Sequence, residues 1–162
     1  PVVDASITYA NSNVPVGKAG LTLGSSFTAT LLYSLDGINY LSTGLTSQFL
    51  GADGDFGSGL IFNQVATISP YTSGTVDFIV QAYNGASFST ATIRGQSSVI
   101  VVSGLATGQT PPGSLFSDNL SVTTPFTSFT VQNVAPVPEP STLALAGLGG
   151  FVMLMALRRK KA

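Results

Sequence analysis

Few side chains in this sequence can carry chemistry, and most of them are aspartates. The 162 residues include no Cys, no His and no Trp, which excludes thiol nucleophiles, imidazole bases and Cys/His zinc sites. Paired carboxylates could form a glycosidase, but the aspartates stand at turns or on the polar side of strand patterns. We therefore expect no enzymatic activity and name no catalytic residue. Residues 1–136 contain no Glu and six aspartates, which are Asp4, Asp36, Asp53, Asp55, Asp77 and Asp118.

Two of these aspartates have the spacing of a calcium-binding loop. Asp53 and Asp55 are separated by Gly54 in the glycine-rich stretch 51–59, and carboxylates two positions apart on a flexible backbone begin many Ca²⁺ loops. An EF-hand would need a Glu at its twelfth position, which here is Gln64. The pair is a candidate Ca²⁺ site, while a solvated hairpin tip explains the same residues. We predict no other metal and no cofactor.

The tyrosines could instead stack on sugar rings, because each has a flat apolar face and a polar tip. Tyr33 and Tyr83 stand in strand patterns, where packing is the commoner role, and Trp, the best stacking residue, is absent. A polysaccharide is therefore the alternative partner. The candidate stacking residues are Tyr9, Tyr33, Tyr40, Tyr71 and Tyr83.

The charged residues separate the chain into a body and a tail. Residues 1–136 carry only Lys18 and Arg94 against six aspartates, a formal charge of −4, whereas the C-terminus carries Arg158, Arg159, Lys160 and Lys161. A body that is acidic and rich in Ser and Thr does not suit nucleic acid. A charge split of this kind indicates two environments.

The residues before the basic cluster have the composition of a membrane span. Residues 143–157 are all apolar or Gly, and a helix over 141–157 would measure about 25 Å, slightly less than a hydrocarbon core of about 30 Å. The basic side chains can snorkel to the interface and hold that end, residues 158–162, in the cytoplasm. We predict a transmembrane helix over 141–157. Its anchor residues are Leu143, Leu145, Leu148, Phe151, Val152, Leu154 and Leu157.

Three small residues form a ridge along the predicted helix. Thr142, Ala146 and Gly150 recur at every fourth position. Such a ridge lets another helix approach closely, although exposure to lipid is an equal alternative.

A proline-rich segment, 133–140, precedes the span and contains Val137, Pro138, Glu139 and Pro140. Proline disfavours helix at the residue before it, so we expect the segment to be extended and the helix to begin near Ser141 as its N-cap. We interpret the segment as a semi-rigid spacer of about 3.1 Å per residue.

Val-Pro-Glu-Pro-Ser-Thr, the apolar run and the terminal Arg-Arg-Lys-Lys together resemble the PEP-CTERM sorting signal of exported Gram-negative bacterial proteins, over residues 137–162. The resemblance implies export, tethering to the inner membrane, and recognition of Pro138-Glu139-Pro140 by an exosortase, with Glu139 a recognition element. It also implies a place at the cell surface, often with exopolysaccharide. Residues 74–103 resemble, less specifically, the bodies of such proteins, which have no general activity.

Alternating apolar residues predict the strands that must position these groups. Residues 3–10, 27–33 and 76–83 follow a two-residue alternation, 99–102 is a short apolar run, and 129–131 predicts a last strand. Further candidates are 40–50, 59–68 and 119–124. Glycine-containing turns separate these segments, as at Asp36-Gly37 and Asn84-Gly85. Residues 87–94 could be a strand or a short helix, and we favour the helix.

These patterns predict an all-β fold, an antiparallel β-sandwich of immunoglobulin-like or jelly-roll type over residues 1–132. We expect an export signal to have been removed before Pro1, and the domain to lie in the periplasm or at the cell surface. The function we predict is that of a non-catalytic structural or interaction protein of the envelope, which associates with itself or with other membrane or envelope subunits. Carbohydrate binding is the alternative.

Overall fold

The structure, a computed structural model, describes residues 6–55, 65–105 and 122–134, and within these residues it contains strands, turns and loops but no helix. The all-β prediction is confirmed for this part of the chain. In sequence order the strands are β1 (Ile7–Tyr9), β2 (Phe27–Ser34), β3 (Leu41–Gln48), β4 (Thr75–Asn84), β5 (Ile93–Gln96), β6 (Ile100–Ser103), β7 (Val122–Thr124) and β8 (Phe129–Asn133).

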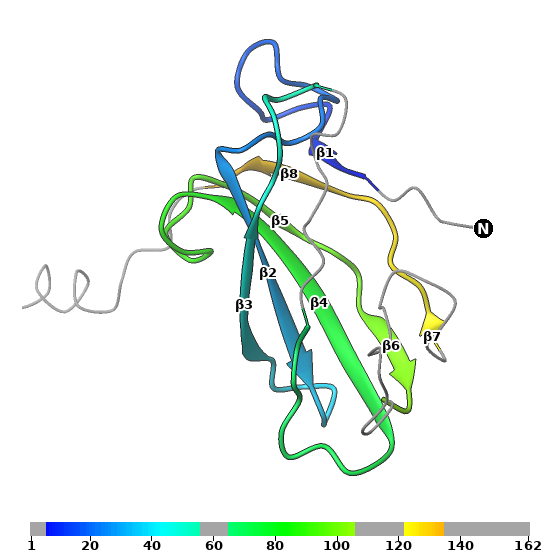
Figure 1. The fold of residues 1–162 in the computed structure, drawn as a ribbon. Helices are drawn as coiled ribbons and strands as arrows, with labels where there is room; N and C mark the ends of the chain where they lie inside the picture. Colours follow the sequence, from blue (N-terminus) through cyan, green and yellow to red (C-terminus); the bar gives the residue numbers. More distant parts are fainter. Residues whose placement is uncertain (1–5, 56–64, 106–121, 135–162) are drawn as a thin grey trace, which may run out of the picture.

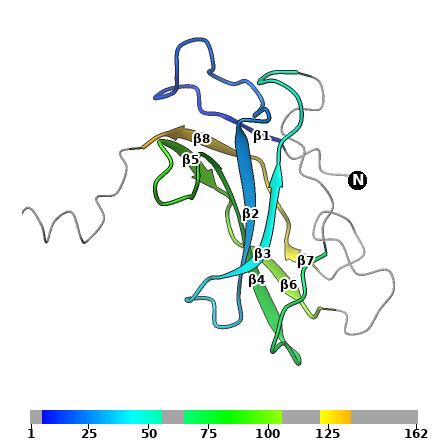
Figure 2. The same ribbon diagram turned by 60° about the vertical axis from the view of Figure 1, so that its left-hand side comes forward.

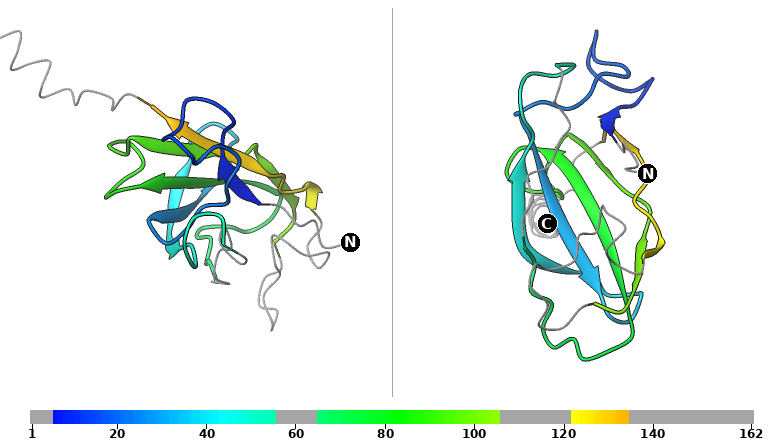
Figure 3. Two further views of the ribbon diagram at one scale, coloured as in Figure 1. Left: turned by 90° about the horizontal axis from the view of Figure 1, so that it is seen from above. Right: turned by 45° about the vertical axis from the view of Figure 1, so that its right-hand side comes forward.

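The strands hydrogen-bond into one sheet, with the order β1-β8-β5-β4-β2-β3. Strand β6 pairs with the other half of β4, and β7 pairs with β6. Figure 1 shows β2, β3 and β4 side by side along the molecule, with β1 and β8 crossing near one end. The turned views in Figures 2 and 3 show that the sheet is strongly twisted and curled.

The purely antiparallel prediction is wrong for one pair, and the sheet is therefore mixed. Strands β1 and β8 run parallel, with Ile7 opposite Phe129 and Tyr9 opposite Val131. The other strand pairs of the described residues are antiparallel. Parallel strands need a long connection, and β1 and β8 are the first and last strands, so no local turn between them could reveal their direction. The expected division into two sheets is likewise replaced by a single hydrogen-bonded sheet among the described strands.

One face of the sheet carries the main hydrophobic core, as the alternation predicts. In β2 and β4 the inward residues pair across the strands, with Ala29 opposite Ala82 and Tyr33 opposite Phe78. A slip of one residue would expose the whole apolar set, so the burial of one face determines the register. Strands β2 and β4 also contribute Phe27, Val76 and Val80 to this core. Other segments add Ile7, Tyr9, Leu23, Phe49, Ile100, Val102, Phe126 and Val131.

The helix that we favoured for residues 87–94 is wrong. Only one helix-like hydrogen bond forms there, from the Ala91 N–H to the Ser87 carbonyl. The turn then ends because the Asn84 side-chain oxygen accepts a bond from the Ile93 N–H at 2.8 Å, and Ile93 begins β5 between β4 and β8. The backbones of β5 and β8 approach so closely at Gly95 that a Cβ there would lie 2.1 Å from a carbonyl oxygen of β8.

A serine joins the two strands that share β4. The gap between β5 and β6 includes Ser97, which is buried. Its backbone N–H donates to the Val80 carbonyl at 2.9 Å, and its hydroxyl accepts a bond from the Val80 N–H at 3.0 Å. The side chain therefore satisfies a buried backbone group where the ladder passes from one strand to the next.

Several predicted segments lie wholly or partly outside the described residues. The strand predicted over 59–68 is described only from residue 65, and 65–68 is not a strand. The candidate strand 119–124 corresponds to β7 from Val122, and the first residue of the predicted spacer, Asn133, belongs to β8. The sorting motif, the predicted membrane helix with its small-residue ridge, and the basic tail all fall after residue 134, outside the described part.

Candidate functional site

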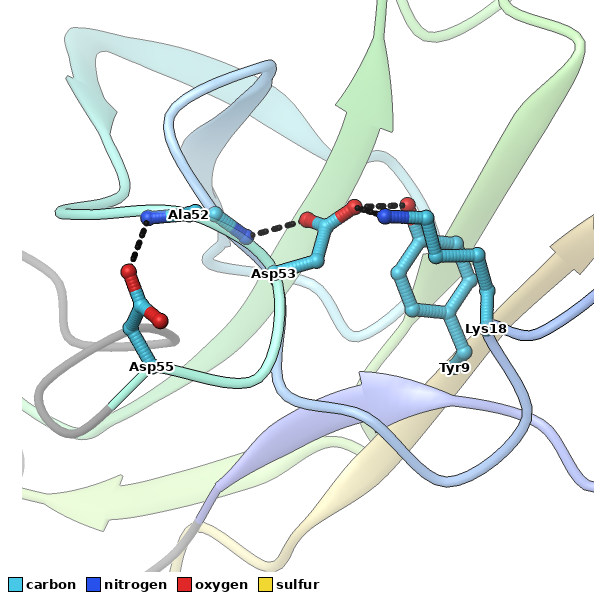
Figure 4. Close-up of polar contacts among 6 residues, drawn as sticks. Tyr9, Lys18, Ala52, Asp53 and Asp55 are labelled. Carbon is cyan, nitrogen blue, oxygen red and sulfur yellow. Dashed lines mark hydrogen bonds and ion pairs between the residues drawn. The ribbon is translucent and has the colours of Figure 1, made fainter.

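Asp53 is the centre of a polar cluster at the end of the sheet that carries β1 (Figure 4). Its side chain is 11% exposed and comes from the loop that follows β3. One carboxylate oxygen accepts the Gly24 N–H at 2.7 Å. The other accepts the Tyr9 hydroxyl at 3.0 Å and forms an ion pair with the Lys18 Nζ at 2.8 Å. The carboxylate thus joins β1 and the loop between β1 and β2 to a loop 29 to 44 positions later in the sequence.

Close backbone packing fixes this geometry. A Cβ at Gly24 would lie 2.6 Å from backbone atoms of Ala52 and Asp53, so only glycine allows the two loops to touch. Tyr9 is buried, and its ring packs edge-on against Phe27, with 5.5 Å between the ring centroids. The phenol is therefore anchored in the core while its hydroxyl reaches the cluster.

The electrostatics of the cluster favour a charged carboxylate and a neutral phenol. Burial alone would raise the pKa of the Asp53 carboxyl, but the bonds from Lys18, Gly24 and Tyr9 together hold it below its usual value. Burial, reinforced by the bond to Asp53 and its negative charge, raises the pKa of Tyr9 well above its usual range. The Tyr9 hydroxyl therefore remains a hydrogen-bond donor at neutral pH, and the cluster is a structural tie between loops.

The two carboxylates of the candidate Ca²⁺ loop serve different partners. Asp55 does not face the Asp53 partners; one of its oxygens accepts the Ala52 N–H at 3.1 Å. Both Asp53 oxygens already accept bonds from donors of the protein. Within residues 6–55, 65–105 and 122–134, no three His, Cys, Asp or Glu side chains gather as metal ligands. The sequence pattern paired Asp53 with Asp55 and did not identify Lys18 and Tyr9 as the partners of Asp53.

The five candidate stacking tyrosines are not equivalent in the structure. Tyr9, Tyr33 and Tyr83 are buried, which removes them as sugar-binding surfaces in this conformation. The Tyr71 hydroxyl donates to the Gly74 carbonyl at 2.8 Å and accepts the Leu105 N–H at 2.9 Å. Tyr40 is partly exposed beside the turn between β2 and β3, where burial and then the negative charges of Asp77 and Asp36 raise its pKa.

The turn between β2 and β3 combines an ordered carboxylate with exposed apolar side chains. Asp36 accepts bonds from the Ile38 and Asn39 N–H groups, the Ser34 hydroxyl and the Asn39 amide. These bonds hold the pKa of Asp36 well below its usual value. Leu35 and Leu41 are exposed nearby, and Ile38 is 80% exposed. The tip is therefore held together by hydrogen bonds to Asp36 and has an apolar surface.

The chain leaves the described part of the fold at the opposite end of β2 and β4 from this tip. Strand β8 ends at Asn133, and the Val134 N–H donates to the Thr92 carbonyl at 2.8 Å. Residues 136–160, which begin two positions after Val134, match the PEP-CTERM protein-sorting motif. The chain carries a PEP-CTERM sorting signal. It is consequently an exported protein with a C-terminal signal of the kind that an exosortase recognises.

The PEP-CTERM match covers the predicted recognition residues Val137, Pro138, Glu139 and Pro140 and most of the apolar and basic segments after them. Of the residues that the structure describes, none belongs to a helix that could cross a membrane, and the predicted span over 141–157 lies beyond them. No curated protein and no solved structure matches the chain.

Proposed function

We propose that this PEP-CTERM chain is a non-catalytic protein of the cell envelope whose β domain acts by associating with other protein chains, including copies of itself. Residues 141–157 hold it at the inner membrane with residues 158–162 in the cytoplasm, until an exosortase recognises Pro138-Glu139-Pro140 and releases the domain. In support of a non-catalytic role, the bonds at Asp36 and Asp53 serve to order loops.

The observation that carries this proposal is the edge strand β3. Among the described residues, β3 pairs only with β2, and its eight residues include no charged side chain. The pairing joins residues 41–42 and 46–48 of β3 to β2, with an irregularity between these two parts. Natural sheets usually protect such edges with charges, prolines, bulges or short strands, because an open edge invites another strand to pair with it. Of these features β3 has only the irregularity in its middle, and residues 46–48 beyond it pair regularly with β2. At one end of β3, Leu41 is 57% exposed, and it adjoins the apolar tip with Ile38. An open neutral edge beside an apolar tip is suited to strand addition from a partner.

The association can be tested by light scattering after size-exclusion chromatography over a range of protein concentrations. We expect the mass of the particle to rise with concentration, and Gln48→Lys, which adds a charge to the edge strand, to shift this rise to higher concentration. The matched control is Gln96→Lys, because Gln96 is also exposed but lies on β5, between two paired strands. A monomer at all concentrations, or equal effects of both substitutions, would contradict association through β3.

The anchoring part of the proposal has its own test. Replacing Leu148 and Val152 together with Arg should move the chain out of the membrane fraction, since each charge near the centre of a span costs about 2.5 to 3.5 kcal/mol on insertion scales. Unchanged fractionation would exclude a membrane span. The intact mass of the chain purified from its native cells, with and without the sorting enzyme, tests whether the tail is released near Glu139.

Carbohydrate binding is a second candidate, supported by Tyr40 at the tip. Burial and the negative charge of Asp77 raise the pKa of this aromatic side chain, and a carboxylate is an acceptor for sugar hydroxyls. Binding of the cell's own exopolysaccharide, lost in Tyr40→Ala but retained in Tyr71→Ala, would favour this role over strand association.

A further inference from the structure

The last hydrogen bonds of the sheet lie immediately before the sorting motif. The Asn133 N–H donates to the Asn13 carbonyl at 2.7 Å, and the Asn13 side-chain amide donates to the Asn133 carbonyl, also at 2.7 Å. One residue later, the Val134 N–H donates to Thr92. The chain is thus held on the folded domain up to Val134 by two separate segments, the loop after β1 and the turn before β5.

This attachment limits how far the sorting enzyme can be from the domain. Only three residues separate Val134 from Pro138, and a fully extended chain advances at most about 3.6 Å per residue, so the two Cα atoms lie no more than about 14 Å apart. That is about half the diameter of a small domain, roughly 30 Å. An enzyme that holds Pro138-Glu139-Pro140 in its active site must therefore touch the end of the domain while β8 stays paired.

The residues that form the surface at this end have no charged side chains. This surface is made by residues 11–13 and residues 85–92, which flank the end of β8 through Asn13 and Thr92, and we call it the exit surface. Ser12 and Ala86 are among its exposed residues. Neither range contains an acidic or a basic residue.

The nearby cations are already engaged. Lys18 forms its ion pair with Asp53. The Arg94 guanidinium donates to the carbonyls of Phe88 and Ser89 and lies 5.2 Å from the centre of the Phe88 ring. Binding to an anionic lipid surface depends on available Lys and Arg side chains. The exit surface has no Lys or Arg of its own, and the Arg94 beside it is held by two backbone carbonyls. A protein is therefore a better partner for this surface than lipid headgroups.

We propose that the exit surface is a contact site for the sorting enzyme, used while the enzyme holds residues 138–140. This inference rests on the proposed sorting of the chain. It adds that part of the recognition comes from the folded domain, in addition to the short motif.

The experiment measures the rate of tail removal from the full chain, by pulse labelling in cells that contain the sorting enzyme. Ser12 is changed to Glu and, separately, to Lys. The same two changes at Ser73 are the matched controls, because Ser73 is also exposed and precedes the start of β4 at Thr75, about 30 Å along that strand from Asn84. We expect both Ser12 variants to slow removal about fivefold, the effect of losing an interface contact worth about 1 kcal/mol, and both Ser73 variants to leave it unchanged.

A flexible spacer before the sorting motif tests the contact independently. Ten Gly and Ser residues inserted between Val134 and Ala135 add about 17 Å of average reach, so the enzyme no longer needs to touch the domain. In that background the Ser12→Glu and unmodified chains should be processed at the same rate. Ala86→Glu probes the exit surface from its other segment, and resistance of each variant to added protease verifies that it is folded.

Three results would overturn the contact. The first is equal processing of the Ser12, Ala86 and Ser73 variants. The second is slower processing for Ser12→Glu with faster processing for Ser12→Lys, which would indicate attraction to an anionic lipid surface. The third is a Ser12 defect that persists with the spacer. Absence of tail removal from the unmodified chain, with or without the enzyme, would instead refute the proposed sorting and the contact with it.

Discussion

Replacing Asp53 with Asn tests whether the polar cluster holds the loops to the sheet. Asn keeps one oxygen for the Gly24 N–H, at 2.7 Å in the native chain, and its NH₂ group can donate to Tyr9. The ion pair with Lys18 is lost, but the Lys18 side chain is 39% exposed, so this pair contributes only about 0.5 kcal/mol. The bonds to Gly24 and Tyr9 lose their charge assistance, about 1 kcal/mol each. We expect Asp53→Asn to lower the free energy of unfolding by about 2.5 kcal/mol.

The assay is urea denaturation of the purified chain, supported by thermal melting, where this loss corresponds to a decrease of about 5 to 10 °C. Asp53→Ala should cost more, about 4 kcal/mol, because it leaves the Gly24 N–H and the buried Tyr9 hydroxyl without their acceptor. The control is Asp55→Asn, an exposed carboxylate in the same loop, with an expected change below about 0.5 kcal/mol. Equal effects at positions 53 and 55 would refute the assignment of a structural role to Asp53.

Three further predictions concern the sheet and its pH dependence. Gly95→Ala should destabilise the domain by about 3 kcal/mol or more, measured by denaturation, because the new Cβ would lie 2.1 Å from a backbone oxygen of β8; a neutral effect would contradict the close β5–β8 contact. Ser97→Ala should cost about 1 to 3 kcal/mol, since the buried Val80 N–H loses its acceptor hydroxyl, and faster hydrogen exchange of the Val80 amide should accompany it. The pKa of Tyr9 is raised in the folded state, so its stabilising contribution is complete below the unfolded pKa of about 10 and is lost as the pH rises further. The melting temperature of the native chain should therefore fall between about pH 8 and 11 by more than that of Tyr9→Phe, which has no phenol to ionise.

The strands were predictable wherever one face is buried along a whole segment. Strand β4 alternates Val76, Phe78, Val80 and Ala82 toward the core, and a period of two admits only one register for a half-buried strand. The turns were equally local: Gly37, in the predicted Asp36-Gly37 turn, has a φ of 71°, a conformation that glycine adopts without steric cost. For such features the nearby sequence contains all the information needed.

The features that escaped prediction depend on contacts between distant residues. The direction of β1 is set by its partner β8, at the other end of the described chain. The pattern within residues 87–94 does not distinguish a short helix from a strand. The strand forms because β5 fits between β4 and β8, which are separate segments of the chain. Asp53 was paired with its neighbour, whereas its partners Tyr9 and Lys18 lie 44 and 35 positions away. The sequence contained one indication of the ion pair, because Lys18 is one of only two basic residues in a body with six aspartates.

The polar cluster and the exit surface are connected through the loop after β1. Lys18 holds one part of this loop to Asp53, and Asn13 holds another part to Asn133 at the end of β8. Both contacts restrain the same short segment, so loosening one removes part of the order that supports the other. Hydrogen exchange can separate local from shared stability. If Asp53→Asn increases the exchange of the Asn133 amide more than that of Val102 in β6, the cluster supports the point from which the sorting motif leaves the domain. Equal increases would show that Asp53 contributes only to the stability of the sheet as a whole.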